Sequence, residues 1–320
     1  MGEVLRNSPQ LAGFESDEWQ ALVGHAAPFA LPAGATLFRQ GDAPDALYLV
    51  ERGSLEIATR LPGDENAILS AIRPGEMVGE FALLDEGPRS ARVRAVEDSS
   101  GLALPRARFL ALLADGSPWA IRLGHALRRL VASRTRATLG RIVAEGLFDP
   151  GALRQLHAGP GPARAKGDPA ALCAGISKIF GATAVSDHGQ LCATAAGAII
   201  ASPGTVQDGL HIVLRGAVRA GVVRGAMQEQ VFVFGPGCFV GLTGHSDGQG
   251  QPLLVTAAED SLLLHLPART LERLERERPA WLPALHTAMG RQLVQDQRKA
   301  NRHLGRSLAL SRFNHAGEAA

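Results

Sequence analysis

The sequence has 320 residues and a net charge of +2, and 46% of its residues are hydrophobic while 20% are charged. This is the profile of a globular protein rather than of a disordered one, and at roughly 100–200 residues per domain the length predicts two domains. The small net charge gives no overall argument for binding nucleic acid, although local patches still matter.

The cysteines and the N-terminus indicate a cytoplasmic protein. Cys173, Cys192 and Cys238 have neither the spacing of a CxxC metal site nor that of a disulfide framework, so a reducing compartment is expected. The segment MGEVLRNSPQ at the N-terminus has no hydrophobic stretch of the kind that a signal peptide needs. No hydrophobic run approaches the roughly 18 residues of a membrane-spanning helix.

Short β-prone segments follow one another in the first third of the chain, separated by Gly, Pro and Asp turns. Strands are expected at Ala46–Val50, Leu55–Ala58, Ala67–Ile72, Ala91–Val96 and Leu102–Leu104. This regular spacing predicts a small all-β roll or barrel.

Helices are expected after the strands. Arg106–Ala114 is a short helical segment, and a long one begins at Ser117 as N-cap with Pro118 at the first helical position. Asp149-Pro150 should end this long helix at about Phe148. The Gly- and Pro-rich residues 158–170, AGPGPARAKGDPA, then predict a linker.

The chain contains an internal repeat. Residues 34–53, GATLFRQGDAPDALYLVERG, align with residues 197–216, GAIIASPGTVQDGLHIVLRG. Further matches follow after a one-residue deletion: Pro74-Gly75 with Pro236-Gly237, Gly79 with Gly241, Glu97-Asp98-Ser99 with Glu259-Asp260-Ser261, and Pro105 with Pro267. Coincidence in an Ala- and Gly-rich chain is the alternative, but a single deletion over this length favours two copies of one domain.

The second copy carries the same helices, at Ala268–Glu277 and from Pro279 to about Leu310. The predicted fold class is therefore α+β and mainly β, with two β-rolls of the jelly-roll barrel kind, each flanked by N-terminal helices and a long C-terminal helix. The expected organisation is a first domain over 1–148, a linker over 149–172 and a second domain over 173–320.

The stretch GEMVGEFALLDEGPRSARVRA, residues 75–95, places charged residues in hydrophobic surroundings between two predicted strands. A short helix after Gly79, over Glu80–Asp85, presents unpaired backbone N–H groups at its start, which suits a small anion. Arg89 can grip the anion through paired donors, and Ser90 adds a hydroxyl. An ionised Glu80 only accepts hydrogen bonds, so it needs a neutral hydroxyl beside the anion. Together these groups predict a sugar-phosphate site.

The same stretch resembles the phosphate-binding cassette of cyclic nucleotide-binding domains. GEFALL and PRSA are similar to the protein kinase regulatory-subunit form, and RSARVRA is similar to the bacterial catabolite activator form. The opening SPQLAGFESDEWQALVGHA also resembles the N-terminal helices of Crp–Fnr regulators. The resemblance covers roughly residues 8–145 and, more weakly, about 190–310.

The resemblance implies a role for each cassette residue. Arg89, Ser90 and the amides near Ala82 would hold the cyclic phosphate, while Glu80 would bind the ribose 2′-hydroxyl. A hydroxyl residue of the long helix caps adenine in catabolite activators, and Ser133 in LRRLVAS aligns with it. The implied nucleotide site is Gly79, Glu80, Phe81, Ala82, Arg89, Ser90 and Ser133.

The ligand implied by the resemblance is cAMP, because the chain is more similar to the catabolite activators, which carry Ser after the Arg. The alternative is cGMP, since a hydroxyl there favours guanine in the kinase-type domains. Two structural alternatives remain open: Glu80 and Arg89 form only an ion pair in a roll without ligand, and Ser133 only faces solvent or the helix seam.

The second copy has lost the charged residues of the cassette. Glu80 aligns with Leu242, Arg89 with Gln251, and Ser90 with Pro252, which offers neither an N–H nor a hydroxyl. Each lost charge-assisted hydrogen bond costs about 1.5–3 kcal/mol, so useful cyclic nucleotide binding is not expected here. A structural or dimer-mimicking role is favoured over a different ligand held by His245, Ser246 or Gln251.

Both long helices carry a hydrophobic seam suited to helix pairing. The seam residues are Leu123, Leu127 and Leu130 on the first helix, and Leu282, Leu285, Met289 and Leu293 on the second. Pairing within one chain as an internal pseudo-dimer is expected, with a homodimer as the alternative. Both helices are also basic; a solvated or protein-facing surface is favoured over an acidic partner or nucleic acid.

Several functional modules have no counterpart in the sequence. No second recognition helix with a Gly turn follows the long helices, so a DNA-binding module is not expected. The ten histidines show no metal spacing, and no nucleophilic triad or P-loop is visible, so neither an enzyme nor a metal site is expected. The sequence favours a cytoplasmic cAMP receptor that signals to an unidentified effector protein. The alternatives are a transcription-associated regulator using its basic helices and a ligand-free scaffold.

Overall fold

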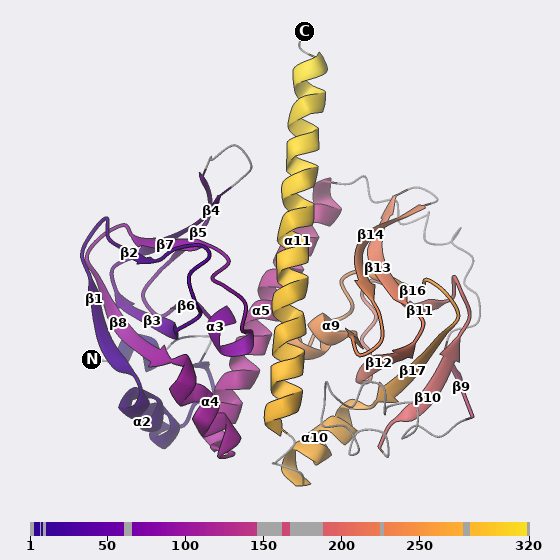
Figure 1. The fold of residues 1–320 in the computed structure, drawn as a ribbon, viewed down its shortest axis with the longest axis horizontal. Coiled ribbons are helices and arrows are strands. Elements are labelled where there is room, and N and C mark those ends of the chain that lie inside the picture. Colours follow the sequence, from indigo (N-terminus) through magenta and orange to yellow (C-terminus); the bar gives the residue numbers. More distant parts are fainter. Residues whose placement is uncertain are drawn as a thin grey trace. The chain divides into compact units, whose positions relative to one another are not determined.

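The protein is described by a computed structural model, which covers residues 3–6, 8, 11–60, 66–145, 162–166, 188–224, 227–277 and 282–318. The chain divides into two compact units, Met1–Leu130 and Val131–Ala320. The boundary falls inside a long helix, so the second half of that helix belongs to the second unit (Figure 1).

The first unit is a β-roll preceded and followed by helices (Figure 1). Its elements are α1 (Glu3–Arg6), α2 (Ser16–His25), β1 (Ala27–Leu31), β2 (Thr36–Phe38), β3 (Ala46–Arg52), β4 (Leu55–Arg60), β5 (Asn66–Ile72), β6 (Met77–Val78), α3 (Phe81–Leu84), β7 (Arg92–Ala95), β8 (Ser99–Pro105), α4 (Arg106–Ala114) and the start of α5 (Pro118–Glu145). The strands form two four-stranded sheets, β1-β8-β3-β6 and β2-β7-β4-β5. The expected roll is confirmed, as two separate sheets rather than one closed barrel.

Aromatic and aliphatic side chains from both sheets fill the first roll. Tyr48 of β3 lies edge-on to Phe29, with ring centroids 5.5 Å apart, and 6.0 Å from the ring of Phe38. Val50, Leu55 and other aliphatic residues complete this core. Strand β3 is buried along almost its whole length because it lies inside its sheet, between β8 and β6.

The second unit contains the second roll. Its elements are the second half of α5, β9 (Ala163–Arg164), β10 (Gln190–Thr194), β11 (Ile199–Ala201), β12 (Leu210–Arg215), β13 (Val218–Arg224), β14 (Met227–Phe234), β15 (Phe239–Val240), α9 (Leu242–Asp247), β16 (Leu254–Ala257), β17 (Ser261–Leu266), α10 (Ala268–Glu277) and α11 (Leu282–Glu318). The sheets are β15-β12-β17-β10-β9 and β11-β16-β13-β14. Apart from β9, this order matches the first roll strand for strand, so the tandem repeat is confirmed.

The repeated Glu-Asp-Ser motif makes the same turn in both rolls. Asp98 Oδ1 accepts a 2.8 Å hydrogen bond from the backbone N–H of Ala33, and Asp260 Oδ1 accepts one of the same length from Ala196. Ser99 Oγ donates to its Glu97 carbonyl at 2.7 Å, as Ser261 does to Glu259. The sequence match at this motif therefore reflects a structural turn and not a binding function.

The second half of α5 and helix α11 pack against each other and against the second roll. Leu139 and Ile142 of α5 share one core with Ala300 and Leu304 of α11 and with strands of the roll. In Figure 1, α11 is the long yellow helix beside α5. Helix α5 is described as far as Glu145, and its expected end at about Phe148 lies outside the described residues. Helix α11 continues to Glu318, beyond the expected end at about Leu310.

Polar residues also connect the two helices. Thr135 Oγ1 lies 2.7 Å from Gln297 Oε1, and Gln297 Nε2 donates to Thr138 Oγ1 at 3.1 Å. Thr138 Oγ1 also lies 3.3 Å from Asn301 Oδ1. Residue numbers rise together along both helices at these contacts, so the helices run parallel, and residues at nearly equivalent positions of the repeat meet.

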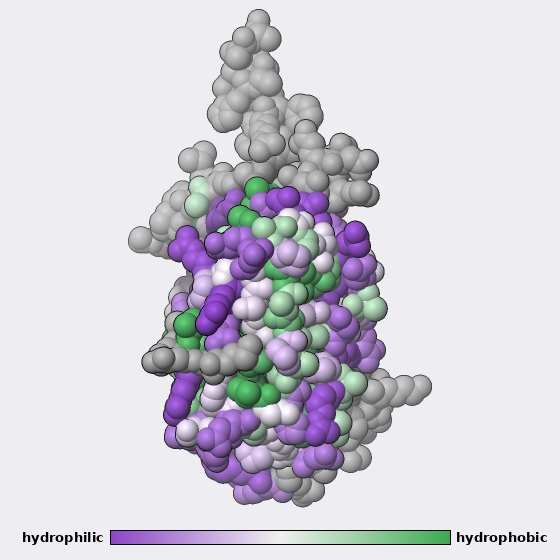
Figure 2. Space-filling model, turned by 90° about the vertical axis from the view of Figure 1, so that its left-hand side faces the viewer, coloured by the Kyte–Doolittle hydropathy of each residue, from purple (hydrophilic) through white to green (hydrophobic). Residues whose placement is uncertain are grey.

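Most of the predicted linker, 149–172, lies outside the described residues, so the expected domain boundaries remain predictions. Within it, Ala163–Arg164 form β9 and pair with β10 at the edge of the second roll. The face in Figure 2 shows hydrophobic side chains in small groups between hydrophilic ones. The described residues contain no helix that is both long and hydrophobic enough to cross a lipid bilayer.

Candidate functional site

The cassette in the first roll is built around Gly79, which follows β6 and precedes α3. Gly79 has φ +85°, a conformation that L side chains rarely adopt. A Cβ at this position would lie 2.6 Å from Nη1 of Arg89 and 3.1 Å from the carbonyl oxygen of Ala46. The position therefore needs glycine for two reasons: the backbone geometry and the close approach of the Arg89 guanidinium.

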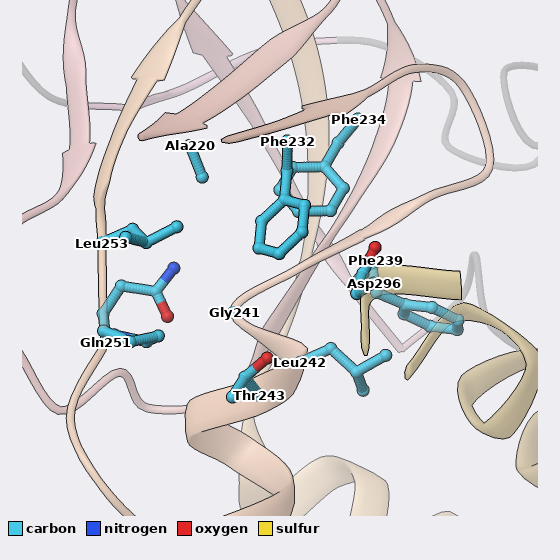
Figure 3. A pocket seen from close by; sticks show the side chains of 11 residues that line it. Ala220, Phe232, Phe234, Phe239, Gly241, Leu242, Thr243, Gln251, Leu253 and Asp296 are labelled. Atoms are coloured by element: carbon cyan, nitrogen blue, oxygen red, sulfur yellow. The ribbon is translucent and has the colours of Figure 1, made fainter. Parts of the chain in front are cut away.

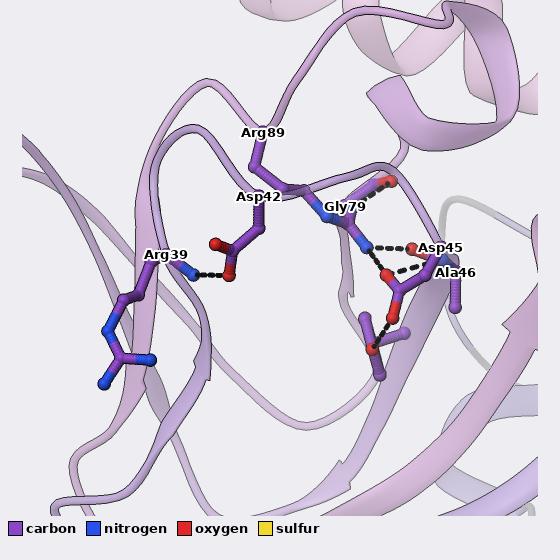
Figure 4. Close-up of polar contacts among 7 residues, drawn as sticks. Arg39, Asp42, Asp45, Ala46, Gly79 and Arg89 are labelled. Carbon is purple, nitrogen blue, oxygen red and sulfur yellow. Dashed lines mark hydrogen bonds and ion pairs between the residues drawn. The ribbon is translucent and has the colours of Figure 1, made fainter.

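Arg89 lies inside the roll, with only 4% of its surface exposed. Its Nη1 donates to the Gly79 carbonyl at 3.1 Å, and its Nη2 donates to the Ala46 carbonyl at 2.7 Å and to Asp45 Oδ1 (Figure 4). The guanidinium carbon lies 4.0 Å from the centroid of the Phe38 ring, in a cation–π arrangement. These contacts fix the guanidinium in one orientation.

One donor of this guanidinium is left over. Arg89 Nε is buried and has no hydrogen-bond partner among the described residues. A guanidinium carries five N–H donors, and the hydrogen bonds of Arg89 to Gly79, Ala46 and Asp45 come from Nη1 and Nη2. A buried donor without a partner is costly and calls for an explanation; an acceptor supplied by a ligand is one.

Asp45 is the residue that sequence reasoning missed. Its carboxylate forms an ion pair with Arg89 while its side chain is 66% exposed, so solvent reaches it. It also accepts hydrogen bonds from the Tyr48 hydroxyl at 3.3 Å and from the Ala46 backbone at 2.8 Å. Burial raises the pKa of Tyr48, and the nearby Asp45 charge raises it further. Asp45 stands far from Arg89 in the sequence, so no local pattern pointed to it.

The remaining cassette residues lie around the same turn. Glu80 is 5% exposed and stands at the N-cap of α3. The Ala82 amide, which was expected to meet the phosphate, donates to the Gly79 carbonyl at 3.0 Å. Phe81 is partly buried and Ser90 is exposed. The turn thus brings Gly79, Glu80, Phe81, Ala82 and Arg89 together.

The family model described as "Cyclic nucleotide-binding domain" matches the chain twice, over residues 28–115 and 192–278. These two segments make up more than half of the 320 residues. The chain belongs to the cyclic nucleotide-binding domain family. The two matched segments fall on the two rolls, so the resemblance seen in the sequence is confirmed for both copies.

Named relatives include regulators and one enzyme. The "Cyclic AMP receptor protein" of Thermus thermophilus is 38% identical over 109 residues, which cover 34% of this chain and 50% of the relative. The cAMP-dependent protein kinase regulatory subunit of Blastocladiella emersonii is 32% identical over 111 residues, covering 35% and 28%. Lysophospholipase nte1 of Aspergillus fumigatus is 34% identical over 113 residues, covering 35% and 7%. The chain spans half or less of the length of these relatives.

The second cyclic nucleotide-binding domain keeps the backbone of the cassette and changes its side chains. The backbone of Arg89 bonds to Gly41 and Asp42, and the backbone of Gln251 bonds in the same way to Gly204 and Thr205. Gln251 therefore stands where Arg89 does in the first domain, as the alignment predicted. With Leu242 in place of Glu80 and Gln251 in place of Arg89, this cassette has neither of the two charged side chains that the first cassette carries at these positions.

Ser133 and several basic residues belong to helix α5 rather than to the cassette segment. Ser133 is exposed and belongs to the second unit, so its adenine role remains a prediction. In the first unit, Arg122 pairs with Glu18 at 2.9 Å, and Arg128 is 3% exposed. In the second unit, Arg136 holds Asp247 of α9 through two bonds of 2.6 and 3.0 Å. Part of the basic stripe therefore makes contacts inside the chain.

Within the described parts of the chain, His, Cys, Asp and Glu residues form no group of three that could hold a metal ion. Cys192 and Cys238 are free thiols, and Cys173 lies outside the described residues.

Proposed function

We propose that the first cyclic nucleotide-binding domain is a receptor for cAMP and that its Arg89 binds the cyclic phosphate. The observation that supports this most directly is the buried guanidinium, fixed by Gly79 and Ala46 yet holding an unpartnered Nε. A phosphate oxygen is the acceptor that such a donor prefers, because charge-assisted hydrogen bonds are stronger than neutral ones. The name of the Thermus thermophilus relative points to the same ligand.

The ion pair between Arg89 and Asp45 is weak, so a ligand phosphate can replace Asp45 at little cost in free energy. An ion pair with one solvent-exposed partner typically contributes about 0–1 kcal/mol, and the Asp45 side chain is mostly exposed. A cyclic phosphodiester can therefore compete for the outer donors of Arg89 at little cost. The contacts to Gly79 and Ala46 keep the guanidinium oriented while this happens.

Glu80 is proposed to bind the ribose 2′-hydroxyl. Its carboxylate is buried beside Gly79, and an ionised carboxylate accepts hydrogen bonds from neutral donors. Ser90 and the backbone near Ala82 would complete the phosphate contacts, and Ser133 would cap the adenine. The proposal favours cAMP over cGMP, which is the alternative ligand for a cassette with a hydroxyl after the arginine.

The output of the receptor is proposed to pass through the long helices to an effector protein. Ligand binding can shift the helices only by as much as its affinity differs between their arrangements. The cations Arg122 and Arg136 are already paired with Glu18 and Asp247, which favours a protein-facing role over DNA binding. A duplex-binding titration at two salt concentrations tests the DNA alternative, because phosphate contacts give a steep salt dependence.

Calorimetric titration of the full chain with cAMP and cGMP tests the assignment. The parent protein should bind cAMP with one site per chain. Arg89→Leu should weaken binding by roughly tenfold to several hundredfold, because it removes charge-assisted hydrogen bonds. Glu80→Ala should weaken binding less, because only the sugar contact is lost.

Arg92→Leu is the matched control for Arg89→Leu. Arg92 lies in the same roll, is 36% exposed and makes one ion pair, at 4.0 Å to Glu56. This variant should bind cAMP as the parent does. Near-unchanged cAMP affinity in both Arg89→Leu and Glu80→Ala would refute the site. A parent protein that binds neither cAMP nor cGMP would refute the receptor function and support the ligand-free scaffold.

A further inference from the structure

The second cyclic nucleotide-binding domain has almost no free space at its cassette. The cavity that remains there has a volume of about 20 Å³ (Figure 3), and this is room for about one or two water molecules. Sites for small molecules typically measure about 300–1,000 Å³. Gly241 and Gln251, which align with Gly79 and Arg89 of the first domain, line the cavity. It therefore stands at the position of a nucleotide site but is too small to admit a nucleotide.

Two phenylalanine side chains of β14 occupy much of this region. Phe232 is 4% exposed and Phe234 is 6% exposed, and their ring centroids lie 5.9 Å apart. Both line the cavity, and the Phe232 side chain points towards the backbone turn at Gly241 (Figure 3). Asp296 of helix α11 lines the cavity as well. Side chains of the second domain thus take up the volume that a ligand would need.

The first roll has a small, exposed side chain at the position of Phe232. Ile57 of β4 pairs with Ser70 of β5, and Ala220 of β13, which aligns with Ile57, pairs with Phe232 of β14. Directly opposite partners lie on the same face of a sheet, and Ala220 also lines the cavity. Ser70 is exposed whereas Phe232 is buried. A large aromatic residue therefore closes the second roll where the first roll is open to solvent.

Helix α11 is held against the filled roll by contacts that need no ligand. Phe232 belongs to one hydrophobic core with Ala300 and Leu304 of this helix. The Gln292 side-chain amide makes two hydrogen bonds of 2.7 Å with the backbone of Phe239, as acceptor from its N–H and as donor to its carbonyl. Close packing of this kind leaves little freedom for the helix to move. The position of α11 in the second unit is therefore set by the chain itself.

We propose that Phe232 permanently fills the nucleotide site of the second domain, so that no nucleotide enters and α11 keeps one arrangement at every nucleotide concentration. The loss of the charged cassette residues is then only part of the reason why this domain does not bind. Restoring the charges alone would create no site, because the space is already filled. This proposal goes beyond the function proposed for the first domain, and it depends on that function only where cAMP serves as a probe.

Thiol labelling tests, without any nucleotide, whether Phe232 closes the site. Gln251→Cys places a thiol at a cavity-lining position that is 7% exposed in the parent protein, so Ellman's reagent should label it slowly. When Phe232→Ser is added, the same thiol should react roughly tenfold faster or more, because solvent then reaches it. Mass spectrometry of the labelled peptides separates this thiol from the native cysteines.

Leu263→Ser is the matched control for Phe232→Ser in the labelling experiment. Leu263 is 0% exposed and belongs to the same hydrophobic core, but it does not line the cavity. Added to Gln251→Cys, it should lower stability without opening the site, so the thiol should stay protected. Circular dichroism shows whether each variant is folded under the labelling conditions.

Nucleotide binding tests whether Phe232, and not the missing charge alone, excludes cAMP. Leu242→Glu, Gln251→Arg and Pro252→Ser together restore the charged and hydroxyl side chains of the first cassette. In calorimetry, this triple variant should bind no more cAMP per chain than the parent. Adding Phe232→Ser should add one site per chain, counted as the difference between the two variants.

Three results would overturn the proposal directly. These are fast labelling of Gln251→Cys while Phe232 is present, equally fast labelling in the Leu263→Ser control, and an added cAMP site in the triple variant that keeps Phe232. Where the parent binds one cAMP, the absence of an added site in the folded variant with Phe232→Ser would overturn it too. A parent that binds no cAMP would refute the function proposed for the first domain, and the labelling rates would then decide this proposal alone.

Discussion

At the scale of single residues, the two units differ in whether their buried charged side chains have hydrogen-bond partners. Arg89 is buried, yet it has acceptors at Gly79, Ala46 and Asp45, so its desolvation is compensated. Gln251 occupies the same backbone position without any charge. Asp296, in the second domain, is a buried carboxylate whose Oδ1 lacks such compensation. The buried cation of the first unit, Arg89, is therefore stabilised by its acceptors, whereas the ionised carboxylate of Asp296 in the second unit is destabilising.

Neutralising Asp45 should strengthen cAMP binding in the first domain. In Asp45→Asn, the ligand phosphate no longer competes with a carboxylate for Arg89. Because Asp45 is mostly exposed, the gain should be only about two- to fivefold, corresponding to less than about 1 kcal/mol. Calorimetry at low and high salt should show this gain shrinking as salt rises. Weaker binding would mean that Asp45 serves mainly to orient Arg89.

Asp296→Asn should stabilise the second unit at high pH. Burial raises the pKa of Asp296 from its ordinary value of 3.8 to about 7 in the folded chain, so between these values the folded state keeps a proton that the unfolded state releases. Stability is therefore fully present below about pH 4 and is lost as pH rises through about 7. The variant avoids this loss, which is on the order of 4 kcal/mol at pH 8.

In Asp296→Asn, the pH dependence of stability that remains should come mainly from His211. Burial lowers the pKa of His211 from 6.5 to about 4, with a further contribution from His265. Its stabilising contribution is present above pH 6.5 and is lost as pH falls through about 4, the opposite slope to that of Asp296. Urea unfolding across this range should show stability rising with pH in Asp296→Asn. The exposed control Asp208→Asn should follow the parent, and a variant no more stable than the parent at pH 8 would contradict the assignment.

At the scale of elements, the β-prone segments located the four strands with a middle position in the sheets of the first roll, the edge strand β5, and the four helices expected after the strands. Strands β1, β2 and β6 were not predicted: β1 contains Pro28, β2 has three residues and β6 has two. Such short strands are defined by pairing with distant partners rather than by their own sequence. For the same reason Asp45 and Asp296 were missed, because each reaches its site from a distant segment.

The ion pair between Arg136 and Asp247 attaches α9 to α5 and should stabilise the second unit. The Asp247 side chain is 0% exposed and the Arg136 side chain 23% exposed, so removing the arginine leaves a buried charge. Arg136→Leu should lower the free energy of unfolding by about 3–5 kcal/mol. A double-mutant cycle with Asp247→Asn measures the coupling. Arg141→Leu, an exposed change on the same helix, should have little effect; an equal loss there would show that the pair contributes nothing specific.

At the scale of the whole molecule, the second unit contains parts of both repeats. The second half of α5 comes from the first repeat, yet Leu139 and Ile142 lie in the core of the second roll with α11. The contacts of Thr135 and Thr138 with Gln297 and Asn301 add polar interactions that fix one register between the helices. In the second unit, the last part of α5 and helix α11 are thus paired within one chain, which favours the internal pseudo-dimer over a homodimer as our prediction.

Because α5 and α11 pair within one chain, we expect the protein to be a monomer in solution. Leu139 and Ile142 of α5 pack with Ala300 and Leu304 of α11, and the buried side chains of Thr135 and Gln297 contact each other. Sedimentation equilibrium should therefore give the chain mass of 33.6 kDa at micromolar concentration, with or without cAMP. Gln297→Leu should lower stability by about 1–3 kcal/mol, because Thr138 and Asn301 lose a partner. Twice the chain mass for the parent protein would instead support pairing between chains, and α5 would then have to leave the second roll.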